Sequence, residues 1–85
     1  MEWIEEIQPS WGRPGWQAVF RYNGQYYLAD LTLVCYEIEC MIFKCDHTGQ
    51  FTFKDALGEY CNRDCEFSPE GLKQCIDEFI EQIKK

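Results

Sequence analysis

The sequence has few basic residues, one histidine and no long apolar run, and each shortage argues against a class of function. Its 85 residues hold 8 Lys and Arg against 15 Asp and Glu, which gives a formal net charge of −7 at pH 7. Direct nucleic-acid binding is disfavoured, because Lys and Arg must displace the counterions that surround the phosphates. No stretch approaches the roughly 18 apolar residues of a membrane-spanning helix, so we also expect no membrane contact.

Motifs of the common enzyme classes are missing as well. A cysteine nucleophile needs a base, and the one histidine, His47, lies on a short turn beside Cys45 with nothing nearby to form an oxyanion hole. The sequence contains no glycine-rich phosphate loop and no His-Glu-x-x-His pair. We therefore do not expect an enzyme.

Six cysteines are the most informative feature that the sequence does contain. The N-terminus lacks the basic segment and the apolar stretch of a secretory signal, so we expect the protein to stay in a reducing cytoplasm. In that compartment a high cysteine content favours a bound metal over disulfides, and buried thiols are the remaining alternative. A chain this short buries only a small core, so a structural metal would add stability.

Alternating apolar residues predict a sheet made of two hairpins. Residues 16–22 alternate in period two, and Asn23-Gly24 then predicts a tight turn into a return strand over 25–33. A third strand is expected over 37–45, followed by the turn 46–49 and a fourth strand over 50–54. Residues 1–15 are rich in proline and glycine, so they predict a turn of helix or an edge segment, followed by a loop.

The C-terminal segment predicts a helix. Ser68 suits the N-cap and Pro69 the first helical position, whereas Gly71 weakens the first turn. Apolar residues recur at three- and four-residue spacing and form one stripe: Leu72, Cys75, Ile76, Phe79, Ile80 and Ile83. The expected fold is a single α+β domain over residues 1–85: a four-stranded antiparallel sheet of two hairpins, one C-terminal helix packed on it, and a zinc-stabilised loop at 55–67.

The register of the second hairpin selects the zinc ligands. If this hairpin turns at residues 47–48, Cys40 faces Asp55 at its open end, from which the 55–67 loop departs. A cysteine just before the third strand lies at the same end. The predicted ligands of one structural zinc are therefore four thiolates, which leave no open position for water: Cys35, Cys40, Cys61 and Cys65.

Other ligand choices stay open. Cys75 lies in the apolar stripe of the helix, where we expect core packing and keep a ligand role as the alternative. Cys45 lies apart from the four, and His47 could pair with it on a metal. Cys35 and Cys40 have opposite strand parity, so both reach one ion only if the chain bends between them.

A resemblance suggests what such a domain does. Residues 16–24, 39–43 and 46–49 carry an aromatic hairpin, the strand Glu-Cys-Met-Ile-Phe and the turn Asp-His-Thr-Gly. This pattern resembles small uncharacterised phage and prophage proteins of Firmicutes, in which a threonine usually stands at the place of Cys40. Small size, acidity and the lack of enzyme motifs are similar to phage inhibitors of host defence, such as the anti-CRISPR proteins that block Cas9, some of which bind zinc.

The resemblance implies a phage-encoded inhibitor, with a structural zinc, that binds a bacterial host protein. Its partner would have a basic nucleic-acid-binding surface, as Cas9 has. The alternative is a zinc-containing accessory or regulatory interaction domain with no inhibitory role. Candidate contact residues are the aromatic Trp11 and Trp16 and the acidic Glu37 and Glu39.

Overall fold

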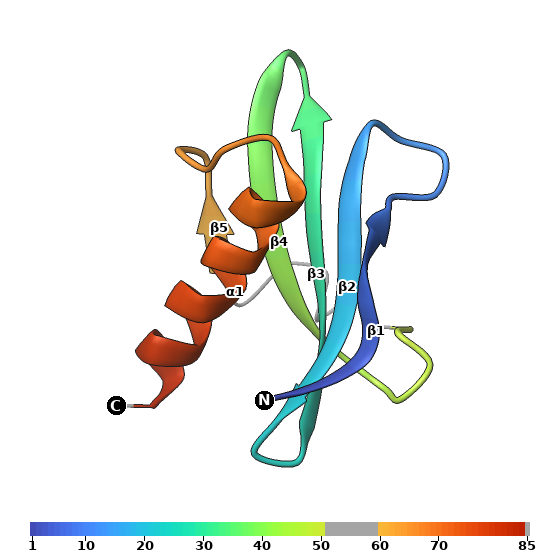
Figure 1. Cartoon of the computed structure of the whole chain (residues 1–85), viewed down its shortest axis with the longest axis vertical. Helices are drawn as coiled ribbons and strands as arrows, with labels where there is room; N and C mark the ends of the chain where they lie inside the picture. Colours follow the sequence, from blue (N-terminus) through green and yellow to red (C-terminus); the bar gives the residue numbers. More distant parts are fainter. Residues whose placement is uncertain (51–59, 85) are drawn as a thin grey trace.

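The chain forms an antiparallel sheet that a helix covers on one face (Figure 1). The computed structural model describes residues 1–50 and 60–84. Its strands lie side by side in chain order, β1-β2-β3-β4-β5. The elements are β1 (Glu2–Pro9), β2 (Gly15–Tyr22), β3 (Gln25–Val34), β4 (Glu37–Cys45), β5 (Tyr60–Asn62) and α1 (Pro69–Ile83). The predicted α+β class, with a C-terminal helix on an antiparallel sheet, is therefore confirmed, but the sheet has five strands where four were predicted.

The β2–β3 hairpin has the predicted turn. Tyr22 pairs with Gln25, and the two residues between them, Asn23 and Gly24, have φ values of 51° and 79°. Asparagine and glycine tolerate this left-handed backbone better than other residues, which is why the dipeptide places the turn.

The β3–β4 hairpin makes a similar two-residue turn from less suitable residues. Val34 pairs with Glu37, and the turn residues Cys35 and Tyr36 have φ values of 52° and 68°. Neither side chain favours the left-handed region, so each adds a conformational cost of about 1 kcal/mol or more. The sequence carried no glycine to mark this turn.

The N-terminal segment is an edge strand, the second of the two predicted alternatives for this region. β1 pairs with β2 from Glu2↔Arg21 to Pro9↔Trp16, with shifts in register on both sides of Glu5. Register shifts and exposed glutamates are features that protect a sheet edge against pairing with another chain.

The partner of β4 differs from the prediction. Cys40 pairs with Leu31 on one side and with Asn62 on the other, so the predicted pairing of Cys40 with Asp55 is wrong. The expected strand over residues 50–54 lies almost wholly outside the described residues, and Gln50 itself is not in a strand. Residues 60–62, expected in an irregular loop, instead form β5 at the sheet edge.

Helix α1 begins and packs as its sequence predicts. The Ser68 hydroxyl accepts a hydrogen bond from the Gly71 amide at 3.0 Å, which caps the first turn. The apolar stripe of the helix faces the sheet, and Phe79 contacts the rings of Phe20 and Tyr27. Within the described residues, no helix is long and apolar enough to cross a membrane.

Candidate functional site

The cysteines separate into a buried cluster and several isolated positions. All six lie in the described part of the chain, and none is in a disulfide. Cys40 on β4 and Cys75 on α1 are buried in the core, and Cys65 packs against the edge of that core from the segment between β5 and α1. These three residues, Cys40, Cys65 and Cys75, form what we call the thiol cluster.

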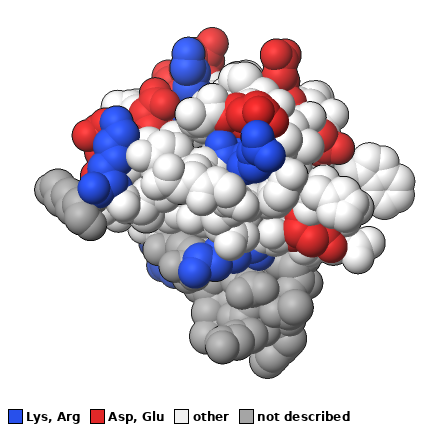
Figure 2. Space-filling view, turned by 90° about the horizontal axis from the view of Figure 1, so that it is seen from below, with Lys and Arg blue, Asp and Glu red and all other residues white. Residues whose placement is uncertain are grey.

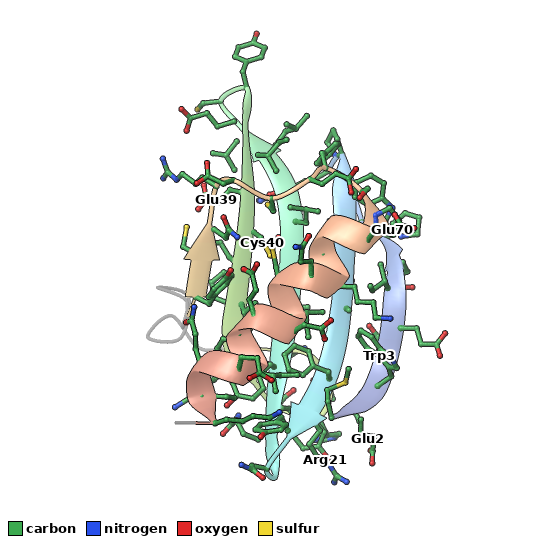
Figure 3. The ribbon with its side chains drawn as sticks, turned by 60° about the vertical axis from the view of Figure 1, so that its left-hand side comes forward. Glu2, Trp3, Arg21, Glu39, Cys40 and Glu70 are labelled. Carbon is green, nitrogen blue, oxygen red and sulfur yellow. The ribbon has the colours of Figure 1, made fainter. Side chains whose placement is uncertain are left out.

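Only two of the four predicted zinc ligands come together. Cys40 pairs with Asn62 whereas Cys61 pairs with Met41, so strand alternation directs the two thiols to opposite faces of the sheet. Cys40 is fully buried beneath α1 (Figure 3), and Cys61 is exposed on the other face, where its thiol donates to Glu39 Oε1 at 3.8 Å. Cys35 is exposed on the β3–β4 turn.

The predicted set of Cys35, Cys40, Cys61 and Cys65 is therefore not assembled in this structure. The reason is strand parity, together with a turn that holds Cys35 beyond the start of β4. Within residues 1–50 and 60–84, no group of three or more His, Cys, Asp or Glu side chains is placed to hold a metal ion.

Cys75 is the centre of the thiol cluster. The neighbouring Cys40 and Cys65 thiols lower the pKa of Cys75 to about 7, although burial and Glu78 oppose the shift. The pKa of Cys40 is raised by its hydrogen bond to Cys75 and by burial. Burial and the Cys75 charge raise the pKa of Cys65 to about 11. Cys75 is thus the thiol that ionises first.

Asn62 connects the thiol cluster to its surroundings. Its side-chain amide donates to Cys75 Sγ at 3.9 Å and to the Tyr60 hydroxyl at 3.1 Å. Its side-chain oxygen accepts from the Asp64 amide at 2.8 Å, and its carbonyl accepts from Cys65 Sγ at 3.6 Å. Asn62 therefore ties β5 to the segment that follows it, and Tyr60 and Asn62 together join β5 to α1.

A small pocket opens beside the cluster. It has a volume of about 60 Å³ and is lined by Asn62, Asp64, Cys65, Gln74, Cys75 and Glu78. Tyr60 closes the network by donating its hydroxyl proton to Glu78 Oε2 at 2.7 Å. The hydrogen bond to this carboxylate and burial both raise the pKa of Tyr60, with burial the larger cause.

Asn62 and Glu78 were not predicted from the sequence. A single asparagine between Cys61 and Arg63 has no spacing that distinguishes it, and Glu78 is one of many acidic residues. One feature of the sequence does point to the thiol cluster. Cys75 lies in the apolar stripe of the helix, which directs its thiol toward the sheet. The core position predicted for Cys75 is confirmed.

A second feature is an exposed apolar surface at one end of the sheet. Tyr36 is fully exposed, Leu33 and Val34 before it are each 42% exposed, and Trp11 on the β1–β2 loop is 93% exposed. The β1–β2 loop and the β3–β4 turn lie at the same end of the sheet (Figure 1). We call this surface, formed by Trp11, Leu33, Val34 and Tyr36, the apolar tip.

Trp16 does not belong to this surface. Its ring packs edge-on against Phe67 with the ring centres 4.9 Å apart, and it contacts the core. Of the two tryptophans expected to be available for contact, Trp11 is therefore the exposed one.

Acidic groups border the apolar tip. Glu37 directly follows Tyr36 and pairs with Arg63 at 3.3 Å, and Arg63 also reaches Glu39 at 3.9 Å. Glu70, at the start of α1, lies in the half of the molecule nearer the tip (Figure 3). Seen from below, the molecule carries basic and acidic side chains interspersed among uncharged residues (Figure 2).

Comparison with protein-family models, with curated proteins and with solved structures found no match to this chain. The thiol cluster and the apolar tip are therefore the observations that bear on function.

Proposed function

We propose that this protein is a protein-binding domain that docks its apolar tip on a basic surface of a bacterial host protein. The observation that carries the proposal is the exposure of Trp11, Leu33, Val34 and Tyr36 at one end of a sheet whose other large side chains are mostly packed inside. Aromatic residues of this kind dominate the binding energy of protein interfaces.

The shape of the tip supports a binding role. Cys35 and Tyr36 hold a left-handed backbone that costs free energy in the unbound protein. That conformation turns the Tyr36 ring fully into solvent, where it stabilises nothing within the chain. A tight turn that presents a bare aromatic ring contributes to a partner contact at little loss of entropy on binding.

Charge favours one class of partner. The chain carries a net charge of −7, and Glu37 lies next to the tip. A protein surface with an apolar hollow and surrounding Lys and Arg fits this combination, and its long-range attraction increases the rate of association. Surfaces that bind nucleic-acid backbones have this basic character.

The activity that fits best is inhibition by occupying such a surface. By its resemblance to small phage proteins, the protein would act on a bacterial defence nuclease, and the guide and target channels of Cas9 are positively charged. The alternative is an accessory or regulatory domain that binds the same kind of surface without blocking it.

A cleavage assay separates these activities. Purified Cas9 with its guide RNA is preincubated with increasing amounts of this protein and then given target DNA. Inhibition at stoichiometric amounts supports the proposal, whereas stable binding with unchanged cleavage supports the accessory role. Absence of both binding and inhibition rules out Cas9 as the partner and removes the support for an anti-CRISPR activity.

Variants then locate the contact surface. Tyr36→Asn removes the ring and suits the left-handed backbone, so it should keep the fold. We expect it to weaken binding about tenfold or more, as loss of a central aromatic contact does. Ile83→Ser is the matched control, because Ile83 is a partly exposed apolar residue at the C-terminal end of α1, away from the tip.

A further inference from the structure

We propose that Cys65 and Cys75 form a peroxide-sensitive dithiol, in which hydrogen peroxide oxidises Cys75 first and Cys65 then closes a disulfide with it. The inference goes beyond partner binding and concerns the contact between α1 and the segment that follows β5.

The placement of the two thiols carries this inference. Cys65 and Cys75 both line the pocket beside α1, and Asn62 contacts both sulfur atoms: its carbonyl accepts from Cys65 Sγ at 3.6 Å, and its side-chain amide donates to Cys75 Sγ at 3.9 Å. The pocket volume of about 60 Å³ exceeds the space of about 15 Å³ that one water molecule requires. A molecule with two heavy atoms, such as hydrogen peroxide, therefore fits in the pocket that Cys65 and Cys75 line.

The surroundings of Cys75 favour its reactive form. The Asn62 amide donates a hydrogen bond to its sulfur at 3.9 Å, and the neighbouring Cys40 and Cys65 thiols also lower the pKa of Cys75. The lowered pKa of Cys75 favours the thiolate, which is the form that attacks peroxide. The Glu78 carboxylate opposes ionisation of Cys75, and Asp64 raises the pKa of Cys65, so the groups that lower the pKa of Cys75 outweigh the acidic residues near it.

Cys65 is better placed than Cys40 to complete the disulfide. Cys40 is fixed within β4, between β3 and β5, and is fully buried. Cys65 lies outside regular secondary structure and is only half-buried, so its sulfur can move toward Cys75 without breaking the sheet.

The chemistry balances with hydrogen peroxide as the oxidant. The Cys75 thiolate attacks one peroxide oxygen, the O–O bond breaks, and the departing hydroxide takes up a proton to become water, leaving a sulfenic acid on Cys75. The Cys65 sulfur loses its proton and attacks the Cys75 sulfur, so the S–S bond forms while the S–O bond breaks and a second water leaves. Two thiols are oxidised and one peroxide is reduced to two waters.

Peptide mapping of the intact protein tests the proposal. The reduced chain is treated with equimolar hydrogen peroxide, its remaining thiols are alkylated, and it is digested with trypsin. Cleavage after Arg63 and Lys73 places Cys65 in peptide 64–73 and Cys75 in peptide 74–84, each without another cysteine. We expect these two peptides to be joined, with a mass lower by two hydrogen atoms than their sum.

Two variants define the order of the steps. In Cys65→Ser the sulfenic acid cannot be resolved, so dimedone should label peptide 74–84. Cys61→Ser, which removes an exposed thiol on the other face of the sheet, is the control and should give the same linked peptides as the natural chain.

Three results would overturn the proposal. One is a link from peptide 74–84 to peptide 22–44, which contains Cys35 and Cys40. Another is alkylation of both Cys65 and Cys75 at a peroxide dose that already oxidises the exposed Cys35 and Cys61. The third is stoichiometric zinc in the purified protein that protects Cys65 and Cys75, since the thiol cluster would then be a metal site.

Discussion

Replacing Asn62 by alanine tests how much the side-chain hydrogen bonds around β5 and the segment after it contribute to stability. Asn62 is half-buried and bridges the segment after β5 to α1. The change removes the bond from the Asp64 amide at 2.8 Å and the bond to the Tyr60 hydroxyl at 3.1 Å. The contacts of the same amide with Glu78 Oε2 at 3.4 Å and with Cys75 Sγ at 3.9 Å are longer and contribute less.

The expected loss of stability follows from these bonds. A neutral hydrogen bond contributes about 0.5–1.5 kcal/mol net, and water can replace part of each bond at a half-buried site. Two well-formed bonds therefore give a loss of about 1.5 kcal/mol in the free energy of unfolding. For a domain of this size that corresponds to a decrease in Tm of roughly 6–12 °C.

Urea unfolding followed by tryptophan fluorescence measures this loss. Gln74→Ala is the matched control, because Gln74 lines the same pocket and is exposed on α1. A surface change of this kind stays within about 0.5 kcal/mol of the natural chain. If Asn62→Ala is no less stable than Gln74→Ala, the hydrogen bonds of Asn62 do not stabilise β5 and the segment after it, and the account of this region is wrong.

Two further substitutions test the packing and the charges. Gly71→Ala should lower the Tm although helix propensity favours alanine by about 1 kcal/mol, because the added Cβ would overlap the carbonyl oxygen of Glu66; a higher Tm would contradict this packing. Burial raises the pKa of Asp30, and one of its carboxylate oxygens is buried with no hydrogen-bond partner among the described residues. Stability is therefore lost as pH rises from about 4 through that raised pKa. Asp30→Asn should accordingly stabilise the protein at pH 7 but hardly below about pH 4. If the variant and the natural chain have equal urea midpoints at both pH values, this reasoning is wrong.

Local sequence signals were sufficient for much of the fold. Asn23-Gly24 specifies its turn because both residues accept a left-handed backbone, and Ser68-Pro69 marks the start of α1 because the cap and the first helical position have distinct chemical needs. These signals act between neighbours in the chain. They do not depend on what the rest of the protein does.

Long-range pairing could not be derived in the same way. The short strand β5 pairs with the middle of β4, and a three-residue segment has too little pattern to reveal its partner. The zinc prediction depended on that pairing. Once Asn62, and not Asp55, lies opposite Cys40, the neighbouring Cys61 must point to the other face. Cys75, and not Cys61, lies beside Cys40 and Cys65. The apolar stripe of the helix predicts that Cys75 is buried, but it does not show that the residue lies next to two other thiols.

The affinity of the protein for Cas9 bound to guide RNA is the measurement that tests the proposed function most directly. It is measured by biolayer interferometry for the natural chain, for Tyr36→Asn and for Ile83→Ser. The account predicts binding by the natural chain and Ile83→Ser, and binding about tenfold or more weaker for Tyr36→Asn. Equal affinities for all three proteins would contradict a role for the apolar tip, and binding by none of them would contradict Cas9 as the partner.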